Sequence, residues 1–174
     1  RGGSKGIPRK NVLDVAGKPL IAWTIEAALA SKTVDKVILS SDDDEIMSVA
    51  KQWGCEVPFR RPSELASDSA SSLDVVLHAI NYYPEYEFVV LLQPTSPLRT
   101  HKHIDEAFEL LYKKKALSCV SIGEMSHPPQ WIYELGKNNK LKALLPVKKK
   151  LSRRQDFPPA YLLNGAIYIS HIAK

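Results

Sequence analysis

The stretch Phe88-Val89-Val90-Leu91-Leu92, followed at once by Gln93-Pro94-Thr95-Ser96, decides the fold of this 174-residue chain. Five consecutive apolar residues that end in a polar turn are typical of a strand buried on both faces. We therefore expect a central strand of a sheet that helices cover on both sides. Gln93 is then the first polar side chain beyond the carboxyl end of this strand.

Helical periodicity flanks this strand on both sides in the sequence. Apolar residues recur at intervals of three and four in four segments: 20–28, 46–53, 73–80 and 104–111. Residues 37–39 and 166–169 are short apolar runs and are predicted as further strands. Strands that alternate with helices predict a doubly wound, mainly parallel α/β sheet with right-handed crossovers. Ligands of such sheets lie at the carboxyl ends of the strands.

The helical pattern stops after about Ser126. Prolines and turn residues interrupt the chain from there, while residues 131–133 and 141–145 are typical of short hairpin strands. Because an isolated hairpin cannot bury both of its faces, we expect residues 125–160 to form a lid or an arm that packs on a second subunit. By length the chain is one domain, residues 1–174.

The composition limits the possible partners. The chain is 44% hydrophobic and 25% charged, as globular proteins are, and its net charge of +5 favours an anionic ligand. Because the sequence contains neither a nucleic-acid motif nor a basic stripe with aromatic residues, we expect no nucleic-acid partner. Cys55 and Cys119 lack the spacing of a disulfide framework or metal site, and no apolar run approaches ~18 residues. We therefore expect a cytoplasmic protein without a membrane partner.

The first eleven residues, Arg1-Gly2-Gly3-Ser4-Lys5-Gly6-Ile7-Pro8-Arg9-Lys10-Asn11, have the chemistry of a phosphate site. The glycines allow backbone N–H groups to approach a ligand, and four cations surround that bend. Together these groups neutralise polyphosphate oxygens. The stretch matches neither the P-loop nor the dinucleotide fingerprint, so by itself it predicts only phosphate binding. A basic terminus without a ligand is the alternative.

Five blocks of sequence follow one another in a distinctive order and spacing. They are residues 1–11, 40–46, 61–72, 91–99, and 153–156 together with 164–168. Together they resemble the acylneuraminate (sialic acid) cytidylyltransferases over essentially the whole chain. The resemblance implies a fold like that of the nucleotide-diphospho-sugar transferases. It also implies a homodimer, in which a nonulosonic acid sugar attacks the α-phosphate of CTP to give the CMP-sugar and pyrophosphate.

The resemblance assigns roles to individual residues. The catalytic residues would be Lys10, beside the transferred phosphate, and Arg154, which would bind the sugar carboxylate from an arm that crosses a dimer. The nucleotide-binding residues would be Arg1, Ser4, Lys5, Asn11, Arg61, Ala70, Ser72 and Gln93. The sugar-binding residues would be Gln93, Arg154, Asn164 and Tyr168. The structural alternatives are a helix N-cap at Ser71 or Ser72, a surface loop at Arg61, a turn at Gln93 and the core at Tyr168.

The resemblance also implies Mg²⁺, but places its Asp-x-Asp motif beyond residue 174, so we assign no metal ligand. Asp42, Asp43 and Asp44 are better explained as N-cap and helix-dipole residues than as metal ligands. We expect the chain to lack the first strand and the C-terminal segment of its domain.

The residues leave the substrate open. Residues 164–167 favour sialic acid (N-acetylneuraminate), whereas Gln130 stands where some members carry a lysine for the sugar. Pseudaminic and legionaminic acid are the alternatives, and a non-catalytic nucleotide-binding module is the alternative of another class.

Overall fold

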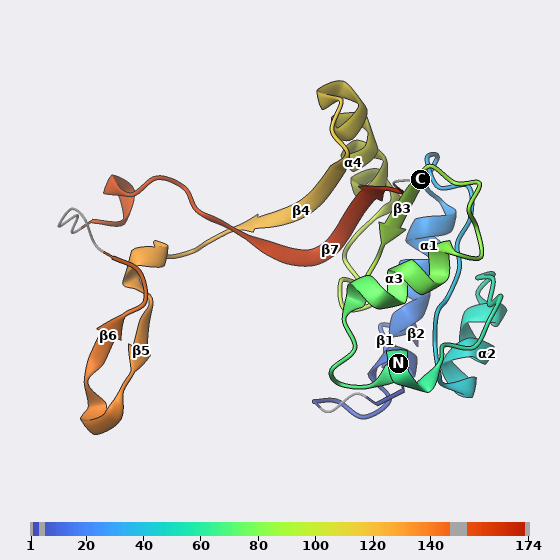
Figure 1. The fold of residues 1–174 in the computed structure, drawn as a ribbon, viewed down its shortest axis with the longest axis horizontal. Helices are drawn as coiled ribbons and strands as arrows, with labels where there is room; N and C mark the ends of the chain where they lie inside the picture. Colours follow the sequence, from blue (N-terminus) through green and yellow to red (C-terminus); the bar gives the residue numbers. More distant parts are fainter. Residues whose placement is uncertain (1, 4–5, 147–152, 173–174) are drawn as a thin grey trace. The chain divides into compact units, whose positions relative to one another are not determined.

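In the computed structural model, residues 2–3, 6–146 and 153–172 are described. The chain divides into two compact units (Figure 1). Unit 1 comprises residues 1–121 and 165–174, and unit 2 comprises residues 122–164. Each of two long strands, β4 (Ser118–Glu124) and β7 (Tyr161–His171), has residues in both units.

The described residues of unit 1 form four α-helices, and all four were predicted from apolar periodicity. They are α1 (Leu20–Leu29), α2 (Asp44–Gln52), α3 (Ser72–Ile80) and α4 (His101–Lys114). Asp43 caps α2 by accepting a hydrogen bond from the Ile46 N–H (3.0 Å), which confirms an N-cap role in this acidic run. Gly54, with a φ of 85°, ends the helix in the left-handed region that glycine tolerates.

The sheet of unit 1 differs in part from the prediction. Its strand order is β3-β7-β4, where β3 (Phe88–Leu91) pairs antiparallel with β7 and Leu91 lies opposite Tyr168. The predicted strand at 37–39 forms one parallel bridge, between Ile38 and Glu56. The α/β class is thus confirmed. The central place expected for β3 is wrong, because within the described residues this strand has a partner on one side only.

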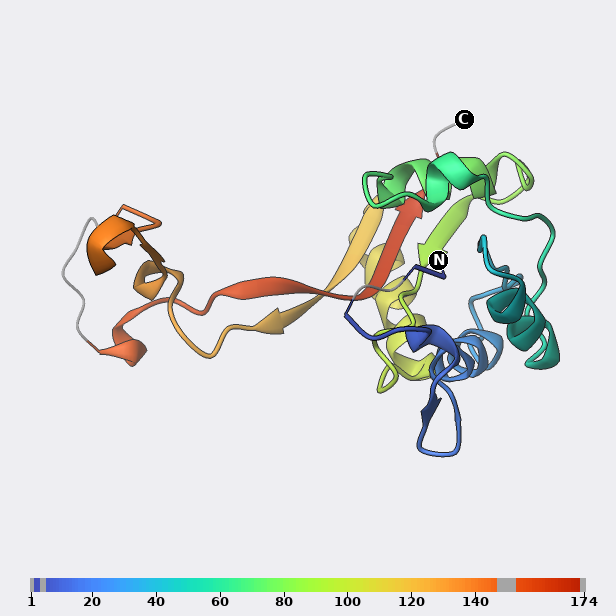
Figure 2. The ribbon, with the colours of Figure 1, turned by 90° about the horizontal axis from the view of Figure 1, so that it is seen from below.

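Two apolar clusters form the interior of unit 1. The first joins α1 to α2 through Ile21, Ile25, Ile46, Ala50 and Cys55. The second packs α4 on β7 (Figure 2), through Ile104, Phe108, Leu111, Ile167 and Ile169. Burial of these side chains is the main contribution to the stability of unit 1.

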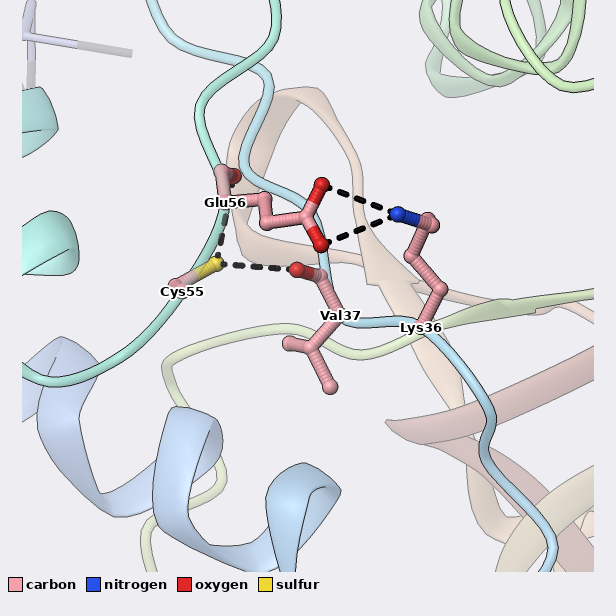
Figure 3. A network of polar contacts seen from close by, with 4 residues as sticks. All are labelled: Lys36, Val37, Cys55 and Glu56. Carbon is pink, nitrogen blue, oxygen red and sulfur yellow. Dashed lines mark hydrogen bonds and ion pairs between the residues drawn. The ribbon is translucent and has the colours of Figure 1, made fainter.

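Polar contacts hold the segment 36–39 against residues 55–56. The Lys36 ammonium contacts both carboxylate oxygens of Glu56 at 2.9 Å, and the Cys55 thiol faces the carbonyl oxygens of Val37 and Glu56 (Figure 3). Burial, with a smaller contribution from the Glu56 charge, raises the pKa of Cys55 to about 11. This thiol is therefore neutral at pH 7.

Unit 2 contains the predicted hairpin and little interior. β5 (Tyr133–Leu135) pairs antiparallel with β6 (Leu141–Ala143), with Leu135 opposite Leu141. The side chains of these two leucines are 70% and 67% exposed. Among the described residues of unit 2, Pro128 alone is fully buried.

The remaining elements are short. They are the strands β1 (Asp14–Val15) and β2 (Lys18–Pro19), and the 3₁₀ helices at Lys10–Val12, Ser63–Ala66, Pro129–Trp131, Lys137–Asn139 and Arg154–Asp156. In the described part of the chain, none of the helices has the length and apolar character needed to cross a bilayer.

Candidate active site

The glycine-rich opening segment lies against the loop that follows residues 37–39. The Gly2 N–H donates a hydrogen bond to the Asp42 carboxylate (3.2 Å), and a Cβ atom on Gly2 would collide with the carboxylate of Asp43. Only a residue without a side chain permits this approach. Arg1, Ser4 and Lys5, which we predicted to bind nucleotide, lie outside the described residues.

Lys10 and Asn11, the last residues of the opening segment, begin a short 3₁₀ helix (Lys10–Val12). Arg9, the residue before it, is in the left-handed region with a φ of 55° and forms an ion pair with Glu45. This pair ties the end of the opening segment to α2. Lys10 and Asn11 are both half-buried, so their side chains are partly fixed by the fold.

A cavity of about 480 Å³ lies within unit 1. Apolar residues of α1, α3, β3 and the segment 37–39 line most of it, and its polar residues include Asn11, Ser40, Arg61 and Gln93. Three of the predicted nucleotide-binding residues, Asn11, Arg61 and Gln93, therefore line the same cavity. They come from three segments that are far apart in the sequence.

Hydrogen bonds to Ser40 and Ser41, which follow the segment 37–39, hold Arg61 in place. Its guanidinium donates to the Ser40 hydroxyl (3.0 Å) and to the Ser40 carbonyl, while its backbone N–H donates to the carbonyl of the fully buried Ser41 (2.8 Å). Arg61 is half-buried in a loop, and its role in nucleotide binding stays a prediction. The fixed guanidinium lines the cavity as an anchored cation.

Gln93 follows the last residues of β3 and is half-buried. Its carbonyl accepts a hydrogen bond from the Ser96 N–H (3.3 Å), so the residue does begin a turn. Its side chain lies against Gly165 in β7: a Cβ atom at Gly165 would come 3.0 Å from the Gln93 Oε1 atom. Gly165 has a φ of 76°, a conformation that favours glycine, and any side chain there would also make the Gln93 amide shift.

The start of α3 resolves the alternative roles of its serines. Ser71 is the N-cap, since its hydroxyl accepts a hydrogen bond from the Asp74 N–H (3.1 Å). Ser72 is the first residue of the helix and is exposed, and Ala70 is half-buried beside the cap. The cap therefore comes from Ser71, and the predicted nucleotide role of Ser72 does not compete with it.

The residues predicted to bind the sugar fall in both units. Arg154 begins the 3₁₀ helix Arg154–Asp156 in unit 2 and lines a second cavity, of about 360 Å³, together with His127 and Phe157. Asn164 is exposed in the part of β7 that belongs to unit 2. Tyr168 is half-buried in the part of β7 that belongs to unit 1.

The described residues do not fit a magnesium site. No group of three or more His, Cys, Asp or Glu side chains within them is arranged to hold a metal ion. In the acidic run 42–44, Asp42 accepts from Gly2 and Asp43 caps α2, so these carboxylates already have structural partners. We therefore derive no step of the reaction through a metal held by these residues.

Comparison with known proteins relates the chain to one family. The family described as Cytidylyltransferase matches residues 1–173. A pseudaminic acid cytidylyltransferase of Campylobacter jejuni is 40% identical over 172 residues, which are 97% of this chain and 74% of that protein. An N-acylneuraminate cytidylyltransferase of Escherichia coli O18:K1:H7 is also 40% identical over 172 residues, which are 98% of this chain and 40% of that protein.

A third relative and a solved structure complete the comparison. A CMP-N,N'-diacetyllegionaminic acid synthase of Legionella pneumophila is 36% identical over 178 residues, covering 98% of this chain and 74% of that protein. The structure of a CMP:2-keto-3-deoxy-manno-octonic acid synthetase complexed with CTP superposes with a TM-score of 0.72 at 20% identity, covering 98% of this chain and 70% of that one. At this identity the likeness confirms the fold, that of the nucleotide-sugar transferases.

Proposed function

Since this chain belongs to the cytidylyltransferase family, and so to the nucleotidyltransferases, we propose that it activates N-acetylneuraminate with CTP and releases pyrophosphate. CMP activation of a nonulosonic acid is common to the relatives named for sialic, pseudaminic and legionaminic acid. The relatives named for pseudaminic acid and N-acylneuraminate are each 40% identical to the chain, so identity does not rank these sugars. Pseudaminic and legionaminic acid are the alternative substrates.

One observation carries the proposal. Asn11, Arg61 and Gln93 line the same cavity, and the Gly2 N–H of the glycine-rich segment donates to the Asp42 carboxylate. An amide and an anchored guanidinium can bind a base and a sugar, while glycine N–H groups and cations suit a triphosphate. These groups support the proposal that the site binds a nucleoside triphosphate.

The chemistry follows from charge and position. In the proposed reaction the anomeric oxygen of the sugar bonds to the α-phosphorus of CTP, and the bond from that phosphorus to the pyrophosphate oxygen breaks. The Lys10 ammonium neutralises charge on the α-phosphate, because such transfers depend mainly on positioning and electrostatic stabilisation. Mg²⁺, which we propose as the cofactor, would supply further neutralisation of the phosphates when bound.

Arg154 completes the proposal from unit 2. Its planar guanidinium suits bidentate binding of the sugar carboxylate. We place it on the arm of a homodimer, because the arm exposes Leu135 and Leu141 and such apolar surface favours burial against another chain. Each arm would then serve the nucleotide site of the partner subunit.

The test is pyrophosphate release from CTP in the presence of N-acetylneuraminate, pseudaminic acid or legionaminic acid, with ATP, GTP and UTP as controls and with or without Mg²⁺. We expect pyrophosphate release with CTP but not with ATP, GTP or UTP, and we expect the fastest release with N-acetylneuraminate. EDTA should abolish the reaction. A faster reaction with pseudaminic or legionaminic acid would make that sugar the substrate in place of N-acetylneuraminate. No release with any sugar would contradict the enzyme function proposed for this chain.

Arg154→Ala tests the sugar site, with Arg153→Ala as the matched control because Arg153 pairs with Asp156 instead. We expect Arg154→Ala to lower kcat/KM for the sugar by about 10- to 100-fold, as loss of a charge-assisted hydrogen bond does, with CTP binding retained. Equal losses in both variants, or loss of CTP binding, would contradict this role.

A further inference from the structure

Arg99 is a charged side chain that the proposed reaction does not use, although it is only 5% exposed. Its guanidinium donates to the carbonyl oxygens of Ala166 (2.7 Å) and Gln93 (3.2 Å), and to the hydroxyl of Thr24 (2.6 Å). These three acceptors belong to β7, the turn after β3, and α1. One side chain thus connects three elements of unit 1.

The partners of Arg99 are all neutral. Within the described residues, its hydrogen bonds go to two carbonyls and one hydroxyl, and its Nε atom has no acceptor. Burial lowers the pKa of Arg99 to about 10, so the side chain is still charged at pH 7. Burying a cation without a carboxylate is costly. A residue whose only task was to fill this space would be apolar.

The bonds of Arg99 fix the two backbone segments that surround the Gln93 side chain. On one side, Gln93 begins two successive turns, closed by the Ser96 N–H on the Gln93 carbonyl and by the Arg99 N–H on the Ser96 carbonyl (3.1 Å). On the other side, Ala166 follows Gly165, whose Cα approaches the Gln93 amide so closely that a Cβ would lie 3.0 Å from it. The Nη1 nitrogen of the guanidinium donates to both carbonyls, while Nη2 donates to Thr24. The planar fork therefore holds all three acceptors in one geometry, which a lysine ammonium does not reproduce.

We propose that Arg99 is a positioning residue, which holds the Gln93 amide against Gly165 at the end of β3 so that it faces the substrate. This inference rests on the proposed function for the role of Gln93 and goes beyond it by naming the residue that orients the amide. Arg99 touches no substrate in this account. Its effect on the reaction passes through Gln93.

The kinetic test is a double-mutant cycle with Arg99→Lys and Gln93→Ala, measured as pyrophosphate release from CTP. We expect Arg99→Lys to lower kcat/KM for the sugar about tenfold, while KM for CTP changes less than twofold. In the Gln93→Ala background the same substitution should change kcat/KM less than twofold, because the amide it orients is absent. A tenfold loss in both backgrounds would overturn the proposal.

Thr24→Val is the matched control, because it removes one acceptor of Arg99 but leaves both carbonyl contacts in place. We expect this variant to lower the Tm and to keep kcat/KM within twofold. If Thr24→Val lowered kcat/KM as much as Arg99→Lys, the role of Arg99 would be general support of the fold, and the proposal would be wrong.

A second measurement does not depend on activity. Hydrogen exchange of the Ser96 amide, which is bonded to the Gln93 carbonyl, should be faster in Arg99→Lys than in the parent chain. If exchange is unchanged, positioning by Arg99 is overturned, even with an active enzyme. If the parent chain releases no pyrophosphate with any sugar, the proposed function fails, and exchange alone decides whether Arg99 fixes the turn.

Discussion

Units 1 and 2 differ in where their apolar side chains lie. In unit 1, Ile104 and Ile169 are 0% and 1% exposed, whereas Leu135 and Leu141 in the hairpin of unit 2 are 70% and 67% exposed. Unit 1 therefore has an interior that stabilises it by itself, while the described part of unit 2 has almost none. The difference indicates that unit 1 carries the fold, and it supports the proposal that unit 2 packs on a second subunit.

The largest expected effect is on the free energy of unfolding, and two substitutions by alanine, one in each unit, test it. Ile104→Ala should lower the free energy of unfolding by about 2–5 kcal/mol, because it leaves a cavity where packing is complete. Leu135→Ala should change it by less than about 0.5 kcal/mol when the chain is monomeric. Urea denaturation followed by circular dichroism measures both. Equal losses would show that the hairpin has an interior of its own.

The second effect concerns association. Leu135→Glu with Leu141→Glu places two charges on the exposed face of the hairpin and should shift the chain from dimer to monomer, because apolar burial drives such contacts. Light scattering after size-exclusion chromatography measures the mass, with Lys137→Glu with Lys140→Glu as the control pair in the same hairpin. If the parent chain is monomeric, or if the variant with both leucines replaced by glutamate remains dimeric, the proposal that the arm packs on a second subunit is wrong.

A smaller effect on the Tm is expected from the hydrogen bonds of the Asp105 carboxylate within unit 1. Although burial alone would raise it, the pKa of Asp105 is lowered, because the carboxylate accepts hydrogen bonds from the hydroxyls of Ser31 and Thr33 and from the backbone N–H groups of Lys32 and Thr33. The stabilisation is therefore fully present above the ordinary pKa of about 3.8 and is lost as the pH falls through the lower pKa of the folded state. Asp105→Asn should lower the Tm by a few degrees, about the effect of one such contact, at pH 7 and much less at pH 3. An equal loss at both pH values would contradict this.

The smallest expected effect is a difference in the rate at which the two cysteine thiols are alkylated. Cys55 is buried with its pKa raised to about 11, whereas Cys119 is half-buried in β4. Iodoacetamide at pH 8 should modify Cys119 first and Cys55 only when the cluster between α1 and α2 opens. Mass spectrometry with time locates the modified residue, and Cys119→Ser is the control. Early modification of Cys55 would show that this part of unit 1 is less closed than its burial indicates.

The sequence predicted the helices well because their apolar spacing and caps are local properties. It predicted a central place for β3 wrongly, since a continuous apolar run reports that both faces are covered and does not report which edges are paired. β4 was missed because its exposed and half-buried residues alternate over Ser118–Glu124, and few of them are large and apolar.

The site was predicted in the same uneven way. Gln93 followed from its place after a strand, and it does line the cavity with Asn11 and Arg61. Arg99 was given no role, because an arginine in a loop is usually exposed and its acceptors are the distant Thr24 and Ala166. Its one local signal is its place after a proline-rich turn at a strand end. Gly165 had no signal beyond being a glycine.

The cavity of unit 1 has a consequence for handling the protein. It is bordered by β3 and by residues 37–39, and β3 has a strand partner on one side only within the described residues. Backbone groups at such an edge accept any extended apolar peptide that reaches them. At high concentration we therefore expect self-association by sheet extension at this edge.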